Sequence, residues 1–176
     1  MRRMDAAAGL FVVMTMAGCA STGGSQAYRA TAALEATTGN QTTGTVTFVQ
    51  RGDKVFVSAD IRGLKPNVEH GFHVHEKGDC SSGDGMSAGG HFNPDGVEHG
   101  HGQPGNTGHA GDMPNLKADA GGNAKTAFEI GKMTVAEGKF SIVGKGLIVH
   151  RDPDDFKTQP TGNAGPRLAC SVIKAV

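Results

Sequence analysis

The sequence predicts an all-β protein in which short antiparallel strands pack into a sandwich or barrel. Apolar and polar residues alternate with period two in several short runs, Gly-rich turns separate these runs, and no segment has a convincing helical pattern of normal length. A chain of 176 residues is long enough to bury one substantial core. We therefore expect a single antiparallel β domain.

The expected strands follow one another along most of the chain. Alternation is clearest over residues 45–49 and 54–61, and Gly52-Asp53 between these runs is a hairpin signal. One face of the second run carries only apolar side chains: Val55, Val57, Ala59 and Ile61. A weaker pattern, interrupted by alanines, covers residues 28–37. The remaining expected strands, in chain order, are 71–75, 125–130, 140–150 and 168–173.

Two long stretches break the β pattern. Residues 77–115 are rich in glycine and histidine and show no periodicity, and residues 151–166 form a second long loop. A loop as long as the first is uncommon inside a compact domain unless something holds it. A disulfide at Cys80 could hold one end, and a bound metal could order the rest.

The N-terminus predicts export. Arg2 and Arg3 give a basic start, and the apolar run over residues 6–17 is too short to span a bilayer. Residues 16–19, Met-Ala-Gly-Cys, resemble a bacterial lipobox in which Cys19 is lipidated. The alternative is ordinary cleavage at this point, which would release a soluble protein.

These features divide the chain into three parts: a signal peptide of lipoprotein type over residues 1–18, a flexible tether over 19–26 and the folded domain over 27–176. Removing residues 1–18 takes away two arginines and one aspartate. The 17 basic and 17 acidic residues of the full chain then become 15 and 16, a net charge of −1. Nothing in this balance favours a nucleic-acid partner.

The cysteine count also bears on the compartment. If Cys19 carries lipid, Cys80 and Cys170 are the two that remain. An even pair in an exported chain favours a disulfide over two separate buried thiols.

His73-Val74-His75 is the first candidate metal motif. Residues i and i+2 of a strand point to the same side, so both imidazoles can reach one ion while Phe72 and Val74 face the core. His150 ends another expected strand. A His-x-His motif alone is a weak signal, and a lone strand-end histidine is usually structural, but a set of imidazoles would suit copper.

The first long loop adds a second group of candidate ligands, namely His91, His99, His101 and His109, followed by Asp112. Imidazole nitrogens with one carboxylate suit zinc. The alternative is a solvated His/Gly-rich tract that binds metals loosely. The varied sequence around His91 and His109 argues against such a tract.

Four motifs closely resemble the Cu,Zn superoxide dismutase family: Gly-Phe-His-Val-His-Glu over 71–76, Gly-His-Phe-Asn-Pro over 90–94, Leu-Ile-Val-His over 147–150 and Gly-Asn-Ala-Gly-Pro-Arg-Leu-Ala-Cys over 162–170. They stand in the family's order, and the resemblance covers about residues 28–176. The N-terminus and the position of Cys80 resemble the bacterial periplasmic, lipoprotein branch. The resemblance implies an eight-stranded Greek-key β-barrel, flattened into an immunoglobulin-like sandwich.

The resemblance also implies the ligands of one copper cation and one Zn²⁺ per subunit. The copper ligands would be His73, His75, His91 and His150, and the zinc ligands would be His91, His99, His109 and Asp112. His91 would bridge the two metals as an imidazolate. His70 and His101 match no family ligand.

Further roles follow from the same resemblance. Asp154 would accept hydrogen bonds from His73 and His99, and Cys80 would pair with Cys170. Arg167 would attract the superoxide anion to the copper. The implied reaction is dismutation of superoxide to oxygen and hydrogen peroxide, during which His91 takes up a proton.

The expected protein is thus an antioxidant enzyme of the bacterial envelope, in the periplasm and anchored by lipid, acting as a monomer or homodimer. Two other readings stay open. One is a non-catalytic copper/zinc-binding or metal-delivery protein of the same fold, and the other is an envelope domain that uses only zinc for stability. A store would not need Arg167, and the second reading would leave His73, His75 and His150 without a purpose.

Overall fold

The computed structural model describes residues 28–100 and 108–176, so the expected signal peptide, the tether and His101 lie outside the described residues. The described parts contain strands β1 (Arg29–Ala36), β2 (Thr43–Arg51), β3 (Lys54–Arg62), β4 (Glu69–His70), β5 (Phe72–His75), β6 (Leu116–Lys117), β7 (Ala124–Ile130), β8 (Gly146–His150), β9 (Arg167–Val172) and β10 (Lys174–Ala175), with one short 3₁₀ helix, η1 (Met86–Ala88). Within them, no helix has the length and apolarity needed to cross a membrane.

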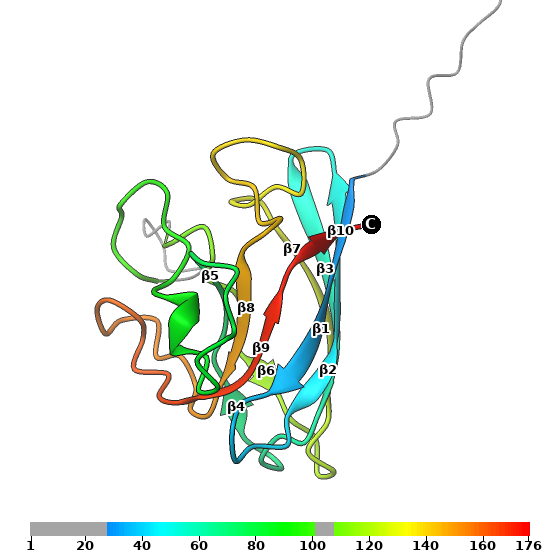
Figure 1. Cartoon of the computed structure of the whole chain (residues 1–176), viewed down its shortest axis with the longest axis vertical. Helices are drawn as coiled ribbons and strands as arrows, with labels where there is room; N and C mark the ends of the chain where they lie inside the picture. Colours follow the sequence, from blue (N-terminus) through cyan, green and yellow to red (C-terminus); the bar gives the residue numbers. More distant parts are fainter. Residues whose placement is uncertain (1–27, 101–107) are drawn as a thin grey trace, which may run out of the picture.

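Eight strands form one antiparallel sheet that curls into a half-barrel (Figure 1). Their order is β5-β8-β9-β1-β2-β3-β7, and β10 also pairs with β1. Strands β4 and β6 form a separate two-stranded sheet. The prediction of an all-β antiparallel domain with eight main strands is confirmed.

The period-two pattern sets the inner face of the sheet. The apolar face of β3 is buried, with Val55, Val57 and Ile61 fully inside the core. On β2, Val46 and Phe48 lie in the same core, opposite Ala59 and Val57 of β3. The hairpin turns at Gly52, whose φ of 61° requires the left-handed region that glycine enters without strain.

The strand expected over residues 140–150 is wrong in its first half. Strand β8 begins only at Gly146. Before it the chain turns: the N–H of Lys145 donates to the C=O of Ile142 at 3.1 Å, and Gly144 within this turn has a φ of 79°. The apolar residues of this segment are buried from an irregular connection, which the alternation alone could not distinguish from a strand.

Two shorter elements also differ from expectation. The strand expected over 71–75 is β5, which begins one residue later, at Phe72, because the N–H of Gly71 donates to the C=O of Asp152 outside the ladder; the short strand β4 precedes Gly71 and was not predicted. Strand β6 was not predicted, since two residues are too few to show a period.

The long loop after β5 is fastened to the sheet by a disulfide. Cys80 and Cys170 are bonded, with their Cα atoms 5.9 Å apart, and Cys170 lies on β9. The bond packs against Ala88 and Ile148. It closes a loop with a sequence separation of 90, which in the chain-entropy model stabilises the fold by about 4–5 kcal/mol.

Candidate metal centre

Strands β5 and β8 place three histidines on one side of the sheet. Phe72 and Val74 of β5 are fully buried in the core, so the residues between and after them, His73 and His75, point the other way. Strand β8 is paired with β5 and ends at His150, where its register against β9 shifts. The long loop covers this side, and all three rings are buried beneath it.

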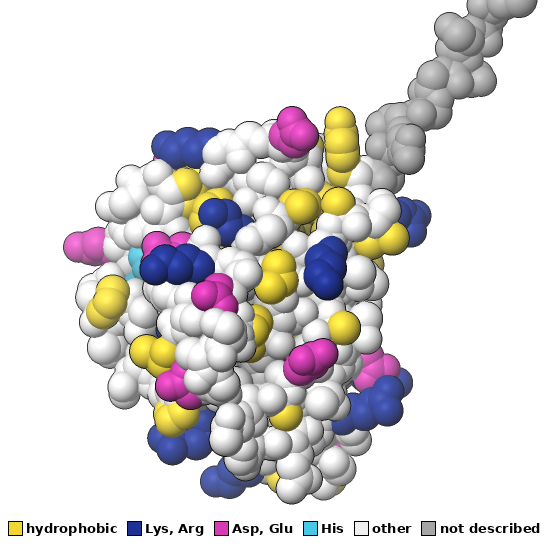
Figure 2. Space-filling view, in the orientation of Figure 1, with side chains coloured by type: hydrophobic (Ala, Val, Ile, Leu, Met, Phe, Trp, Pro, Cys, Tyr) yellow, Lys and Arg dark blue, Asp and Glu magenta, His cyan; other side chains and the backbone are white. Residues whose placement is uncertain are grey.

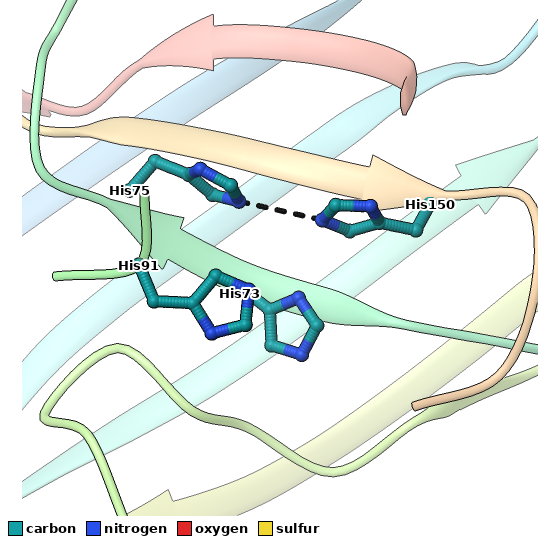
Figure 3. Close-up of side chains that lie close together, drawn as sticks. All are labelled: His73, His75, His91 and His150. Atoms are coloured by element: carbon teal, nitrogen blue, oxygen red, sulfur yellow. Dashed lines mark hydrogen bonds between the residues drawn. The ribbon is translucent and has the colours of Figure 1, made fainter. Parts of the chain in front are cut away.

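His91 completes a set of four imidazoles with His73, His75 and His150 (Figure 3). One ring nitrogen from each lies within 4.8 Å of the others. The Nε2 atoms of His75 and His150 are 3.3 Å apart, and the rings of His73 and His91 have centroids 4.0 Å apart. Four buried nitrogens that converge in this way suit a single copper ion.

Backbone carbonyls fix the tautomers of two of these rings. The Nδ1 of His75 donates to the C=O of Gly89 at 2.9 Å, and the Nδ1 of His150 donates to the C=O of Gly165 at 3.1 Å. A carbonyl oxygen only accepts, so both rings keep the proton on Nδ1 and present the Nε2 lone pair to the centre of the set.

Asp154 orients the third ring and joins the two metal sets. Its Oδ2 lies 2.8 Å from Nε2 of His73, and its Oδ1 lies 2.9 Å from Nε2 of His99. His73 is thereby left with a buried Nδ1 that has no hydrogen-bond partner among the described residues. An orphaned buried nitrogen facing three others is what a metal ligand requires.

The second set consists of His91, His99, His109 and Asp112, whose ligand atoms lie within 4.8 Å of one another. The Asp112 carboxylate lies 2.8 Å from Nδ1 of His91, 3.0 Å from Nδ1 of His99 and 3.3 Å from Nδ1 of His109. Three imidazoles and one carboxylate are a donor set that zinc favours.

His91 belongs to both sets. Its Nδ1 faces Asp112 in the zinc set, while its Nε2 is buried without a hydrogen-bond partner among the described residues. One ring can therefore offer a nitrogen to each metal, as the predicted bridge requires. His70, predicted to be no ligand, donates from Nδ1 to the C=O of His150 at 2.9 Å and belongs to neither set.

Burial keeps the rings of His75, His91 and His150 neutral. It lowers the pKa of His75 and of His150 well below the ordinary value, and repulsion between neighbouring histidines lowers each further. Burial also lowers the pKa of His91 to about 4, although Asp112 opposes the shift. Neutral imidazoles have the lone pairs that a metal needs.

On the zinc side, hydrogen bonds to carboxylates outweigh the effect of burial on the pKa of His99. Burial alone would lower the pKa of His99, but hydrogen bonds to Asp112 and Asp154 outweigh it and raise the pKa to about 9. Burial alone would raise the pKa of each carboxyl group, yet the histidine hydrogen bonds hold both pKa values well below the ordinary range. Both carboxylates are thus ionised, and zinc binding would displace the proton held by His99.

Arg167 reaches the copper side from the start of β9. Its Nη1 donates to the C=O of Gly85 at 2.5 Å and its Nη2 to the C=O of Gly89 at 2.6 Å. The Gly89 oxygen is the one that also accepts from His75. Burial lowers the pKa of Arg167 from its ordinary value, with Asp84 opposing, and the guanidinium remains charged.

Several contacts that support the site have no signature in the sequence. The side-chain amide of Asn115 exchanges two hydrogen bonds with the backbone of Asp154, at 2.9 and 3.0 Å. Lys132 donates to the C=O of Gly108 at 2.7 Å, beside the ligand His109. Isolated amides and lysines carry no spacing pattern, so nothing in the sequence distinguished them.

A curled all-β sheet with an all-imidazole set, an imidazole–carboxylate set and one histidine shared between them defines a protein that binds copper and zinc side by side. The family profile described as copper/zinc superoxide dismutase (SODC) matches residues 42–173. The chain belongs to this family, and its copper and zinc sets are complete.

Individual relatives support the same family assignment. The chain is 47% identical over 136 residues to a superoxide dismutase [Cu-Zn] of Paramecium bursaria Chlorella virus 1, covering 74% of this chain and 71% of the relative. It is 40% identical over 135 residues to superoxide dismutase [Cu-Zn] 2 of Aquifex aeolicus, covering 74% and 78%. It is 42% identical over 141 residues to an extracellular superoxide dismutase [Cu-Zn] of Drosophila melanogaster, covering 76% of each.

Solved structures show the same fold. The clock protein EA4 has a TM-score of 0.76 at 38% identity, with 84% of this chain and 94% of that chain covered. A SOD-like protein from Bacillus subtilis has a TM-score of 0.73 at 32% identity, with 81% and 96% covered.

Gly162 provides a test of the link through Asp154. Its φ is 65°, and a Cβ there would clash with Oδ1 of Asp154 and lie 2.6 Å from Nε2 of His99. We expect Gly162→Ala to displace the Asp154 carboxylate and to lower the affinity for both copper and zinc by roughly 10–100-fold, as measured by chelator competition.

The matched control is Gly39→Ala. Gly39 has a φ of 81°, but a Cβ there meets nothing within 4 Å. This variant should lose about 1 kcal/mol of stability through backbone strain alone and bind both metals normally. Equal metal affinities in the two variants would contradict the proposed role of Asp154.

Proposed function

We propose that this Cu,Zn superoxide dismutase removes superoxide in the envelope of a bacterial cell, with His91 and Arg167 as its catalytic residues. The observation that carries the proposal is the sharing of His91 between two complete, buried ligand sets. The net reaction consumes two superoxide anions and two protons and yields one molecule each of oxygen and hydrogen peroxide.

The protein's own groups organise this chemistry. Bound copper supplies a one-electron redox couple, and bound zinc supplies a fixed positive charge without redox change. His91 holds its Nδ1 toward the zinc set, so Nε2 is the atom at which a proton can be held and released between the two half-reactions. Asp154 keeps the rings of His73 and His99 in one orientation throughout.

Arg167 is proposed to attract the anion. On the face in Figure 2, basic and acidic side chains are interspersed rather than segregated, and without residues 1–18 the chain has 15 basic and 16 acidic residues, a net charge of only −1. Attraction must therefore come from charges close to the site. Arg167 is half-buried, and its two backbone hydrogen bonds hold the guanidinium beside His75.

A second candidate is a non-catalytic copper/zinc-binding or metal-delivery protein. Two solved proteins with this fold are described not as superoxide dismutases but as a clock protein and as a SOD-like protein. Against this candidate, the chain fixes a charged Arg167 next to the copper set, which metal storage would not need.

The envelope location rests on three features. The Cys80–Cys170 disulfide is stable in an oxidising compartment, one relative is described as extracellular, and residues 1–18 have the pattern of a bacterial signal peptide. Lipid on Cys19 would anchor the mature protein, and residues 19–26 would tether the domain to the membrane surface.

The dismutase activity is tested by the double variant His73→Ala, His75→Ala. Loss of two copper ligands should abolish copper-dependent superoxide removal while the core stays folded, since both side chains point away from it. Superoxide removal is measured after copper and zinc loading, with circular dichroism as the control for folding. A folded wild-type protein that holds both metals without activity would favour the non-catalytic candidate.

Arg167→Ala tests anion attraction. Removing the charge should lower kcat/KM by about tenfold and flatten its dependence on ionic strength. The control is Arg62→Ala, which removes the same charge from an exposed position on β3. An unchanged rate at equal copper occupancy, or a loss of the same size in Arg62→Ala, would rule out this role.

Cys19→Ser tests the anchor. The full-length wild-type protein should incorporate labelled fatty acid and fractionate with membranes, and the variant should do neither. Wild-type protein that is released without acyl label would support ordinary cleavage instead.

A further inference from the structure

Gln159 makes an unusual contact with a zinc ligand. Its Oε1 accepts from the N–H of His99 at 2.8 Å, and its Nε2 donates to the C=O of the same residue at 3.0 Å. One side-chain amide therefore pairs with both backbone groups of His99, as a neighbouring strand would. His99 is fully buried, whereas Gln159 lies at the surface of the loop over 151–166.

This contact differs from the others around the zinc set. Asp154 holds the rings of His73 and His99 and so touches both metal sets. Asp112 is itself a ligand, and it also accepts from the N–H of Gly100 at 3.1 Å. Gln159 contacts the main chain of His99. In the described structure, its side chain makes no hydrogen bond to any other residue of the two ligand sets.

The amide is not a ligand, because both of its polar atoms are engaged by the backbone. Its effect on the metal must pass through His99. The main chain of His99 determines where its ring lies relative to a tetrahedral ion. Because two hydrogen bonds already hold this main chain in the metal-free protein, it loses less conformational entropy when the metal binds.

We propose that Gln159 is a positioning residue for zinc, which fixes the main chain of His99 and thereby raises the affinity for zinc far more than the affinity for copper. Selectivity follows from the contacts, since His99 belongs only to the zinc set. The inference rests on the zinc set of the proposed function and not on dismutation, so a protein without activity would leave it testable.

The test compares Gln159→Met with Gln41→Met in the full domain. Methionine keeps the length of the side chain and removes both polar atoms. Gln41 is an exposed glutamine in the turn between β1 and β2 and controls for the substitution itself. Zinc and copper affinities are measured separately by chelator competition, and unfolding of the metal-free protein is measured in urea.

We expect Gln159→Met to weaken zinc binding about tenfold, the low end for a contact outside the ligand set because water can reach the loop, and to leave copper affinity near the level of Gln41→Met. The metal-free protein should lose some stability, because the buried N–H and C=O of His99 lose their partner. Hydrogen exchange at the His99 amide gives a direct readout. The amide should exchange faster in Gln159→Met and stay protected in Gln159→Glu, which keeps the accepting oxygen.

Two outcomes would overturn the proposal. Unchanged zinc affinity despite faster exchange at His99 would show that the contact does not position the ligand. A loss of copper affinity as large as the loss of zinc affinity would show that Gln159 is a general structural residue of the loop.

Discussion

The buried carboxylate of Asp154 is the interaction on which both metal sets depend. One of its oxygens holds His73, from the rigid strand β5, and the other holds His99, from the long loop. Its own backbone is held by the amide of Asn115. Because a buried charge is costly unless it is fully hydrogen-bonded, the carboxylate cannot release either ring cheaply. The two ligand sets are therefore coupled before any metal binds.

The centre is divided between sheet and loops. His73, His75 and His150 come from paired strands, so the geometry of the copper set is largely that of the sheet. The zinc set comes from the loop, whose described residues, 77–100 and 108–115, form no strand ladder among themselves and are held by the disulfide, by Asp112 and by contacts from other segments. Strand β5 bridges to His91 and Asp112, and bound zinc would add order to the rest of the set, with His91 shared with the copper side.

The sequence allowed prediction wherever a local rule determines the outcome. The period of two placed β2 and β3 and put His73 and His75 on one face, because strand geometry alone decides both. It failed over residues 140–145, where burial comes from tertiary packing of an irregular segment. The ligand sets came from resemblance, and the structure brings every predicted ligand together. The tautomers and the Gln159 contact depend on segments far apart in the chain, which no local pattern encodes.

The Gly89 carbonyl shows how one atom can link several of these functions. It accepts from Nδ1 of His75, which sets the tautomer of a copper ligand, and from Nη2 of Arg167, which sets the position of the guanidinium charge. The loop that carries Gly89 is fastened to β9 through Cys80 and Cys170, and Arg167 begins that same strand. A displacement of the loop would therefore disturb the ligand and the charge together. This arrangement explains how an irregular covering loop can still form a preorganised site. The loop is fixed by the disulfide near Gly89, the residue whose carbonyl contacts both His75 and Arg167.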